Sequence, residues 1–199
     1  MLSSLRNIII FAALNILNMR NLGFLLVAIS SLSIAQTWTQ SQMLTHSDPD
    51  QNDRFGSNID GAGDYVVVTS TGEDFDELGE NQADQAGAAY VLKKDAFGDW
   101  QEVQKLVAPD REASDYFGSA VAMTDGWILV GAESEDHDLD GLNELSSAGS
   151  AYVYEKTGPD TWGNPQKLVP SDRASASSYF GNSVAIMDSV LFVASYYRH

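Results

Sequence analysis

The amino-acid sequence predicts an all-β protein, an incomplete β-propeller of about 2.6 blades with four antiparallel strands each. The first observation is a Phe-Gly step that occurs at Phe55, Phe117 and Phe180, with spacings of 62 (117 minus 55) and 63 (180 minus 117). The second is a series of short, β-rich segments separated by turn residues. The third is that no segment of the repeat carries apolar residues at helical spacing over three turns.

Other markers keep the same period, which extends the repeat over the whole unit. The segment from Gly87 to Val91 returns one period later as the segment from Gly149 to Val153. Two further residue types recur at steps of 62: Trp38, Trp100 and Trp162, and Leu44, Leu106 and Leu168. A four-stranded unit repeated at this spacing is typical of propeller blades rather than of helical repeats.

The second repeat shows the expected strands in order. Residues 121–123 lead into an Asp-Gly turn at 125–126, which favours positive φ, and an apolar run of strand length follows at 127–130. After a long polar loop come the β-formers of 151–154, a turn at 157–160 and a last strand near 166–169. We therefore expect about four strands per period.

The recurring Phe is expected to pack between neighbouring sheets rather than to bind a ligand. Burying such a ring contributes about 2–3 kcal/mol of transfer free energy. The glycine beside Phe117, and the small pair Gly131-Ala132, suit places where two backbones approach closely.

The N-terminal segment 1–35 has a different composition from the repeats, with no acidic residue and two apolar stretches at 8–16 and 22–34. Met19-Arg20-Asn21, the second stretch and the small residues before Gln36 predict a signal peptide over 1–35. Met19 is then a candidate initiator, with 1–18 an extension upstream. An uncleaved membrane anchor is the alternative, although neither stretch reaches the ~20 uninterrupted apolar residues of a spanning helix.

Residues 36–199 are thus expected to be the exported body, secreted or at the cell surface. A propeller ring needs at least about four blades, so we expect a fragment or truncated product whose partners include further blades. A ring closed by oligomerisation is the less favoured alternative.

Composition excludes several classes of partner and chemistry. The formal net charge of −17 argues against nucleic acid and against an anionic membrane surface as partners. The chain has no cysteine, which excludes thiol catalysis and thiolate metal sites. Such an excess of acidic residues suits solubility, cation binding or a basic ligand.

The acidic loop at 136–144 predicts a Ca²⁺ site. Asp136, Asp138 and Asp140 occupy positions 1, 3 and 5, and Gly141 at position 6 allows the sharp turn that wraps oxygens around the ion. Leu142 would add its carbonyl oxygen, and Glu144 would ligate directly or through water. Position 12 is Ser147 and the flanks are strands, so this is no EF-hand; a solvated acidic hairpin is the alternative.

The matching loop at 74–82 is the weaker candidate for Ca²⁺. Asp74, Asp76 and Gly79 keep positions 1, 3 and 6, but Leu78 replaces the third carboxylate. Because affinity follows the number of charged ligands, we expect weaker binding here.

No catalytic constellation is evident, and the protein is not expected to be an enzyme. The three histidines, His46, His137 and His199, do not recur with the period and are expected at the surface. Phosphate loops, dinucleotide fingerprints and nucleophile elbows are absent from the sequence. Asp110-Arg111 and Asp172-Arg173 recur before the Phe-Gly step, and we expect a surface ion pair or turn, with a ligand-binding arginine as the alternative.

The unit that starts at Phe117-Gly118 and ends in Val130-Gly131-Ala132 resembles the FG-GAP repeat, over about residues 37–199. That resemblance implies a propeller head like those of integrin α subunits and bacterial surface proteins, often loaded with calcium. The chain departs from the family in lacking the proline of its name, since Glu133 follows Ala132. Only a tight turn separates Phe-Gly from Gly-Ala here, so the integrin calcium positions do not carry over.

Two functions are therefore expected. The first is an exported, non-catalytic binding or adhesion module that recognises an extracellular protein or glycan. The alternative is a scaffold or targeting segment of a larger secreted enzyme.

Overall fold

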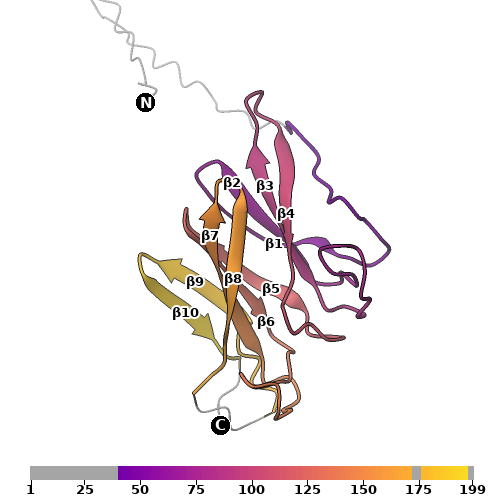
Figure 1. Ribbon diagram of the computed structural model, residues 1–199, viewed down its shortest axis with the longest axis vertical. Helices are drawn as coiled ribbons and strands as arrows, with labels where there is room; N and C mark the ends of the chain where they lie inside the picture. The colour runs from indigo at the N-terminus through magenta and orange to yellow at the C-terminus, as the bar shows by residue number, and fades with distance from the viewer. Residues whose placement is uncertain (1–39, 172–175, 197–199) are drawn as a thin grey trace, which may run out of the picture. The chain divides into compact units, whose positions relative to one another are not determined.

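The computed structural model describes residues 40–171 and 176–196, and these residues form three antiparallel sheets with no helix among them (Figure 1). The predicted signal peptide, with its apolar helix at 1–35, lies outside the described residues. Among the residues that are described, no helix has the length and hydrophobicity to cross a membrane.

The first two sheets each contain four strands whose order in space follows their order in the chain. The first consists of β1 (Phe55–Ala62), β2 (Tyr65–Ser70), β3 (Ala88–Lys94) and β4 (Trp100–Leu106). The second consists of β5 (Phe117–Met123), β6 (Trp127–Ala132), β7 (Ser150–Gly158) and β8 (Thr161–Leu168). The third holds β9 (Ser183–Met187) and β10 (Val190–Ala194). This up-and-down order is that of propeller blades, and it confirms four strands per period.

The register of the strands repeats together with the sequence. Ile59 pairs with Val68 in the first sheet, and Val121 pairs with Val130 at the same place in the second. Both hairpins are irregular just after the Phe-Gly step. Since a slip by a single position would turn every side chain to the other face, this agreement shows that the two sheets are structural copies.

Neighbouring sheets touch through backbone at two glycines. Gly87 forms a parallel bridge with Phe117, and Gly149 forms the same bridge with Phe180. A Cβ on either glycine would lie 2.1 Å from the carbonyl oxygen of its phenylalanine partner. These contacts explain why glycine recurs before the third strand. The close approach of backbones that was expected at Gly131 is also present, since a Cβ there would lie 1.9 Å from the Gly181 carbonyl oxygen.

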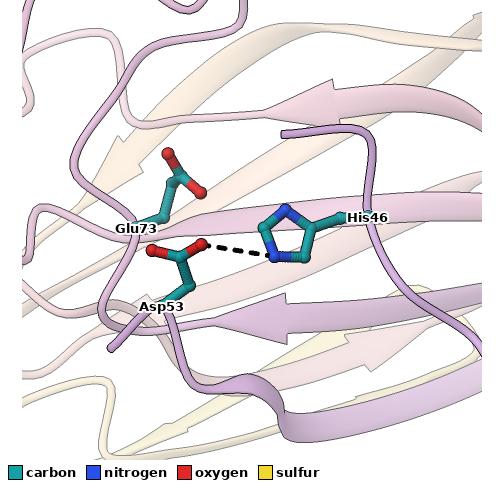
Figure 2. A group of neighbouring side chains, drawn as sticks. All are labelled: His46, Asp53 and Glu73. Atoms are coloured by element: carbon teal, nitrogen blue, oxygen red, sulfur yellow. Dashed lines mark ion pairs between the residues drawn. The ribbon is translucent and has the colours of Figure 1, made fainter. Parts of the chain in front are cut away.

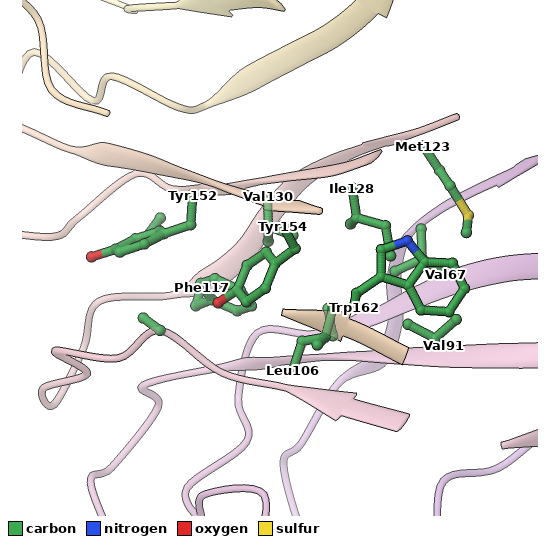
Figure 3. Packing of buried hydrophobic residues seen from close by; sticks show 13 residues of the cluster. Val67, Val91, Leu106, Phe117, Met123, Ile128, Val130, Tyr152, Tyr154 and Trp162 are labelled. Carbon is green, nitrogen blue, oxygen red and sulfur yellow. The ribbon is translucent and has the colours of Figure 1, made fainter. Parts of the chain in front are cut away.

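Phe117 lies in the core between the first two sheets, with none of its surface exposed (Figure 3). Its ring centroid is 5.7 Å from that of Tyr152, and Phe55 stands at the same 5.7 Å from Tyr90 in the first sheet. The cluster around Phe117 draws side chains from both sheets: Val67, Val91, Leu106, Met123, Ile128, Val130, Tyr154 and Trp162. The prediction of a packing role for the recurring phenylalanine is confirmed.

The third sheet continues this stacking with one covered and one open face. Leu191 and Val193 pack against Leu129 of the second sheet. Phe192, on the opposite face, is 48% exposed, whereas Leu129 is fully buried. The described residues therefore comprise two complete sheets and two strands of a third.

Candidate functional site

The two acidic loops, which follow β2 and β6, fold in the same way. In the loop after β6, His137 and Glu144 form an antiparallel bridge, and Gly141 turns the chain at a φ of 67°. The Gly141 amide donates to the Asp138 carbonyl at 3.2 Å. In the loop after β2, the Gly79 amide donates to the Asp76 carbonyl at 3.1 Å. Both loops are small hairpins closed by glycine in the left-handed region.

Asp138 accepts hydrogen bonds from its own loop. Its Oδ1 receives the backbone amides of Asp140 at 3.2 Å and Leu142 at 3.0 Å, and its Oδ2 receives the side-chain amide of Asn143. The bond from Asn143 and the backbone bonds stabilise the charged form, so the pKa of Asp138 is lowered to about 2. Asp76 has the same three kinds of donor in the first loop, and its pKa is lowered by the Glu80 amide and the Asn81 side chain.

The first carboxylate of each loop closes the loop at its far end. Asp136 Oδ1 accepts the Ser147 amide at 2.7 Å, and Asp74 Oδ1 accepts the Gln85 amide at 2.7 Å. Two of the predicted calcium ligands in each loop thus also hold the backbone in place, a role that sequence reasoning did not assign.

The remaining predicted ligands of the second loop lie at its surface. Asp140 is exposed, Leu142 is 81% exposed, and the Glu144 carboxylate stands 3.6 Å from His137 Nε2. Within the described residues, the loop carboxylates do not form a group of three whose ligand atoms all lie within 4.8 Å. The Ca²⁺ site therefore stays a prediction, one that would require the loop to draw its oxygens together.

The recurring Asp-Arg pair has a different role from the expected one. Arg111 reaches back to the first acidic loop, where its Nη1 donates to the Asn81 carbonyl at 2.5 Å and its Nη2 to the Asp74 carbonyl at 2.9 Å. Asp110 binds Lys167 at 2.7 Å instead of Arg111. The surface ion pair between Asp110 and Arg111 does not form, because each side chain has a partner in another part of the fold, whereas the turn that was the other expectation is present at 109–110. The second pair, at 172–173, lies outside the described residues.

A cleft of about 500 Å³ opens beside Arg111, between the first two sheets. The first acidic loop contributes Asp76, Glu77 and Asn81, and β8 contributes Trp162. The Nε of Arg111 and the Nε1 of Trp162 are both buried and lack a hydrogen-bond partner within the described residues. Two unused donors therefore lie among the side chains that line this cleft.

A second group of polar residues is buried inside the first repeat (Figure 2). His46, Asp53 and Glu73 are 5%, 5% and 1% exposed, and their ligand atoms all lie within 4.8 Å of one another. His46 Nδ1 contacts Asp48 Oδ1 at 3.0 Å, while its Nε2 faces Asp53 Oδ2 at 3.4 Å. In the described residues no other group of three such side chains comes this close.

Lys105 supplies the positive charge of this cluster. Its Nζ lies 2.7 Å from Asp48 and 3.1 Å from Glu73, and the Tyr90 hydroxyl donates to Glu73 Oε2 at 2.7 Å. Burial opposes the ionisation of Asp48, but hydrogen bonds from Lys105 and His46 outweigh it and lower the pKa to about 2. Burial raises the pKa of Asp53 above its usual range.

The second repeat contains the same cluster without the histidine. Lys167 binds both Asp110 and Glu135 at 2.7 Å, and the Tyr152 hydroxyl donates to Asp110 at 2.8 Å. Burial raises the pKa of Asp115 to about 7, and the neighbouring Glu135 carboxylate adds to the effect. The position of His46 is taken one period later by Ala108.

Sequence reasoning missed both clusters and misplaced His46. It expected the histidines at the surface, but His46 packs against the rings of Phe55 and Tyr90, at centroid distances of 5.0 and 4.6 Å. The sequence did contain an indication of these clusters, because four charged residues of the first cluster recur in the second repeat: Asp48, Asp53, Glu73 and Lys105. A charged residue that recurs at one phase of a repeat is a candidate for the buried interior as well as for the surface.

The family model of the FG-GAP repeat matches residues 38–92 and 100–154, which are two successive copies of the unit. The chain belongs to the FG-GAP repeat family. The first matched segment covers β1, β2 and the start of β3, and the second covers β4, β5, β6 and the start of β7. FG-GAP repeats build propeller-type modules that are often involved in binding. No curated protein sequence matched the chain.

Proposed function

We propose that this FG-GAP chain is an exported, non-catalytic binding or adhesion module that recognises an extracellular protein or glycan. The observation that carries this proposal is the cleft beside Arg111. It combines carboxylates, an amide and aromatic rings between the first two sheets, a composition typical of sites that orient a polar ligand against an apolar wall.

The unused donors of the cleft support a ligand with acceptor oxygens. Arg111 Nε and Trp162 Nε1 are buried without a partner in the described residues, and burying a polar group without one costs about 1–3 kcal/mol. Both atoms are buried, so a hydroxyl or carbonyl oxygen of a bound ligand would supply the missing acceptor once the side chains around them shift. Sugars and peptide backbones both carry such oxygens.

Ca²⁺ is part of the proposal as a stabilising ion of the acidic loops. The loop at 136–144 has a carboxylate at position 5 where the loop at 74–82 has a leucine, and the carbonyls of the first loop are already held by the Arg111 cation. We therefore place the stronger calcium site at Asp136, Asp138, Asp140, Leu142 and Glu144, and the weaker one at Asp74 and Asp76.

The alternative is a scaffold or targeting segment of a larger secreted enzyme. The net charge of −17 favours neither nucleic acid nor an anionic membrane as partner in either case. Export rests on the N-terminal sequence, and N-terminal sequencing of secreted material would test it. A mature protein that begins at Gln36 is expected, and a retained 1–35 segment would contradict export through a cleaved signal.

Binding is tested by probing the full chain against arrays of glycans and of extracellular matrix proteins, with Ca²⁺ and with EDTA. Glu77 is exposed and lines the cleft, so Glu77→Gln should weaken binding to any ligand found. Glu80 is exposed in the same loop but does not line the cleft, so Glu80→Gln serves as the matched control. Equal loss in both variants, or no ligand in either condition, would count against this site.

A further inference from the structure

Three electron-pair donors converge in the interior of the first repeat. His46 comes from the segment before β1, Asp53 from the turn that leads into β1, and Glu73 from the loop after β2 (Figure 2). All three are almost completely buried, and their ligand atoms lie within 4.8 Å of one another. Ligands that surround one ion at about 2.0–2.2 Å are necessarily separated by distances of this order.

Hydrogen bonding orients the imidazole toward the two carboxylates. Asp48 can only accept, so His46 Nδ1, at 3.0 Å from Asp48 Oδ1, carries a proton. In the neutral ring Nε2 then offers a lone pair, and it faces the lone pairs of Asp53 Oδ2 across 3.4 Å. Two acceptors in this arrangement repel each other unless a cation or a proton lies between them. A carboxylate on Nδ1 is also the usual partner of a metal-binding histidine, because it sets the tautomer and the ring orientation.

The net negative charge of the cluster also favours a bound cation. Asp48, Asp53 and Glu73 set three carboxylates against the single ammonium group of Lys105. An excess of buried negative charge is unfavourable unless a cation or a proton neutralises it. The shortest contact of Lys105, at 2.7 Å, is to Asp48, the carboxylate on the Nδ1 side of His46.

We propose that His46, Asp53 and Glu73 bind one divalent transition-metal ion of the zinc class. One imidazole and two carboxylates form a three-ligand set that leaves a fourth position for water. Glu73 Oε2 receives one hydrogen bond, from Tyr90, within the described residues, and a carboxylate oxygen has room for a second partner. Ca²⁺ is disfavoured because it takes oxygen ligands, so this site is chemically distinct from the acidic loops.

The second repeat provides an internal control for this metal site. It repeats the carboxylates as Asp115 and Glu135, but Ala108 stands where His46 stands in the first repeat. Ala108 is buried and has no ligand atom, and within the described residues the second cluster does not bring three ligand atoms within 4.8 Å of one another. The first repeat alone is therefore expected to bind.

The test is titration of the untagged full chain with Co²⁺, read by visible absorption, followed by displacement with Zn²⁺ and, separately, Ca²⁺. We expect one Co²⁺ per chain at neutral pH, displaced by Zn²⁺ and not by Ca²⁺. His46→Ala should abolish the absorption, and Asp53→Asn should weaken Zn²⁺ binding by at least about tenfold. His137→Ala should bind like the wild type, and thermal melts in EDTA verify that each variant is folded.

A histidine introduced into the second repeat tests whether a second metal site can be created. Ala108→His is expected to raise the number of bound Co²⁺ ions from one to two, because it completes the ligand set of the second repeat. The proposal is overturned by a folded wild type that binds no Co²⁺, by His46→Ala that binds as well as the wild type, or by Ca²⁺ that displaces Co²⁺ as readily as Zn²⁺. If His46→Ala fails to fold, the number of Co²⁺ ions bound by the wild type and the affinity of Asp53→Asn for Zn²⁺ test the proposal instead.

Discussion

The side-chain amide of Gln104 holds both backbone polar groups of Trp162. Gln104 Nε2 donates to the Trp162 carbonyl at 2.8 Å, and the Trp162 amide donates to Gln104 Oε1 at 2.7 Å. Gln42 makes the same pair of bonds to Trp100 one repeat earlier. A glutamine of the preceding repeat therefore holds the last strand of each four-stranded sheet, so the first two sheets share a polar contact in addition to the apolar contact at Phe117.

Replacing Gln104 should weaken the seam between the first two sheets. Gln104→Ala leaves a backbone amide and a carbonyl of Trp162 without partners, which we expect to lower the free energy of unfolding by about 1–3 kcal/mol. Gln166 is the matched control, because it is exposed and occupies the same place one repeat later. Urea unfolding of both variants measures the difference, and an equal effect would show that the clamp contributes nothing.

Gly87 should tolerate no side chain, for two separate reasons. Its φ is 87°, and a Cβ would lie 2.1 Å from the Phe117 carbonyl oxygen, so Gly87→Ala should destabilise by roughly 2–4 kcal/mol. Gly98 has a φ of 96°, but its nearest neighbour to an added Cβ is a lysine side-chain carbon at 3.7 Å. Gly98→Ala should therefore cost only the strain of a side chain at positive φ, about 1 kcal/mol of unfolding free energy. Thermal melts that rank the two variants the other way would contradict this seam contact.

The raised pKa of Asp115 should make stability fall with rising pH. A carboxyl group with a pKa of about 7 in the folded protein and 3.8 when unconstrained keeps its proton only in the folded state between these values. The free energy of unfolding should thus decrease from about pH 4 to about pH 7, by up to about 4 kcal/mol for this group. Urea unfolding at several pH values measures the slope.

Asp115→Asn isolates this contribution. Its amide oxygen can still accept the Glu112 backbone amide that Asp115 Oδ2 accepts at 2.6 Å, but it does not titrate. The variant should be more stable than the wild type at pH 8, with a flatter profile across pH 4–7. Asp99→Asn, at an exposed site, should keep the wild-type slope. Parallel profiles for wild type and Asp115→Asn would assign the pH dependence to another group.

Calcium should raise the melting temperature of the full chain. An ion that binds only the folded state stabilises it by about 2.7 kcal/mol at a concentration about 100 times its Kd. Asp140→Asn should remove much of this response, because it deletes an exposed carboxylate of the loop while the bonds to Asp138 and Asp136 remain. Asp125→Asn, exposed in a turn, is the control. An identical melt in Ca²⁺ and in EDTA would show that the loops are solvated hairpins.

The sequence predicted the sheets well because their signal is local and occurs more than once. Strand periodicity and the Phe-Gly step each depend on a few neighbouring residues, and both recur with the repeat. The Asp-Gly turn at 125–126 is closed by a hydrogen bond from the Thr124 amide to the Trp127 carbonyl, but neither of its two residues has the positive φ that the sequence favours. The role of Phe117 followed for the same reason, since a ring at one phase of a stacked repeat meets the same neighbours in every copy.

The site residues were harder to predict because their partners are distant in sequence. His46 was assigned to the surface because it does not recur with the period. The fold nevertheless brings Asp53 and Glu73 around it, together with a lysine as far along the chain as position 105. Arg111 was likewise paired with its neighbour Asp110 rather than with the first acidic loop, which lies well upstream. A charged side chain shows its own chemistry in the sequence, but its burial depends on which strands enclose it.

By itself the sequence determined the repeat, its strands and the phenylalanine that packs between neighbouring sheets, because these follow from spacing along one chain. Only the tertiary structure decided which charges are buried and which carboxylates hold backbone amides. It also showed that His46 lies within reach of two buried carboxylates, whereas Ala108, at the same phase of the repeat, has no ligand atom to offer. The physical reason is that desolvation and hydrogen bonding depend on distances across sheets, which have no counterpart in residue order.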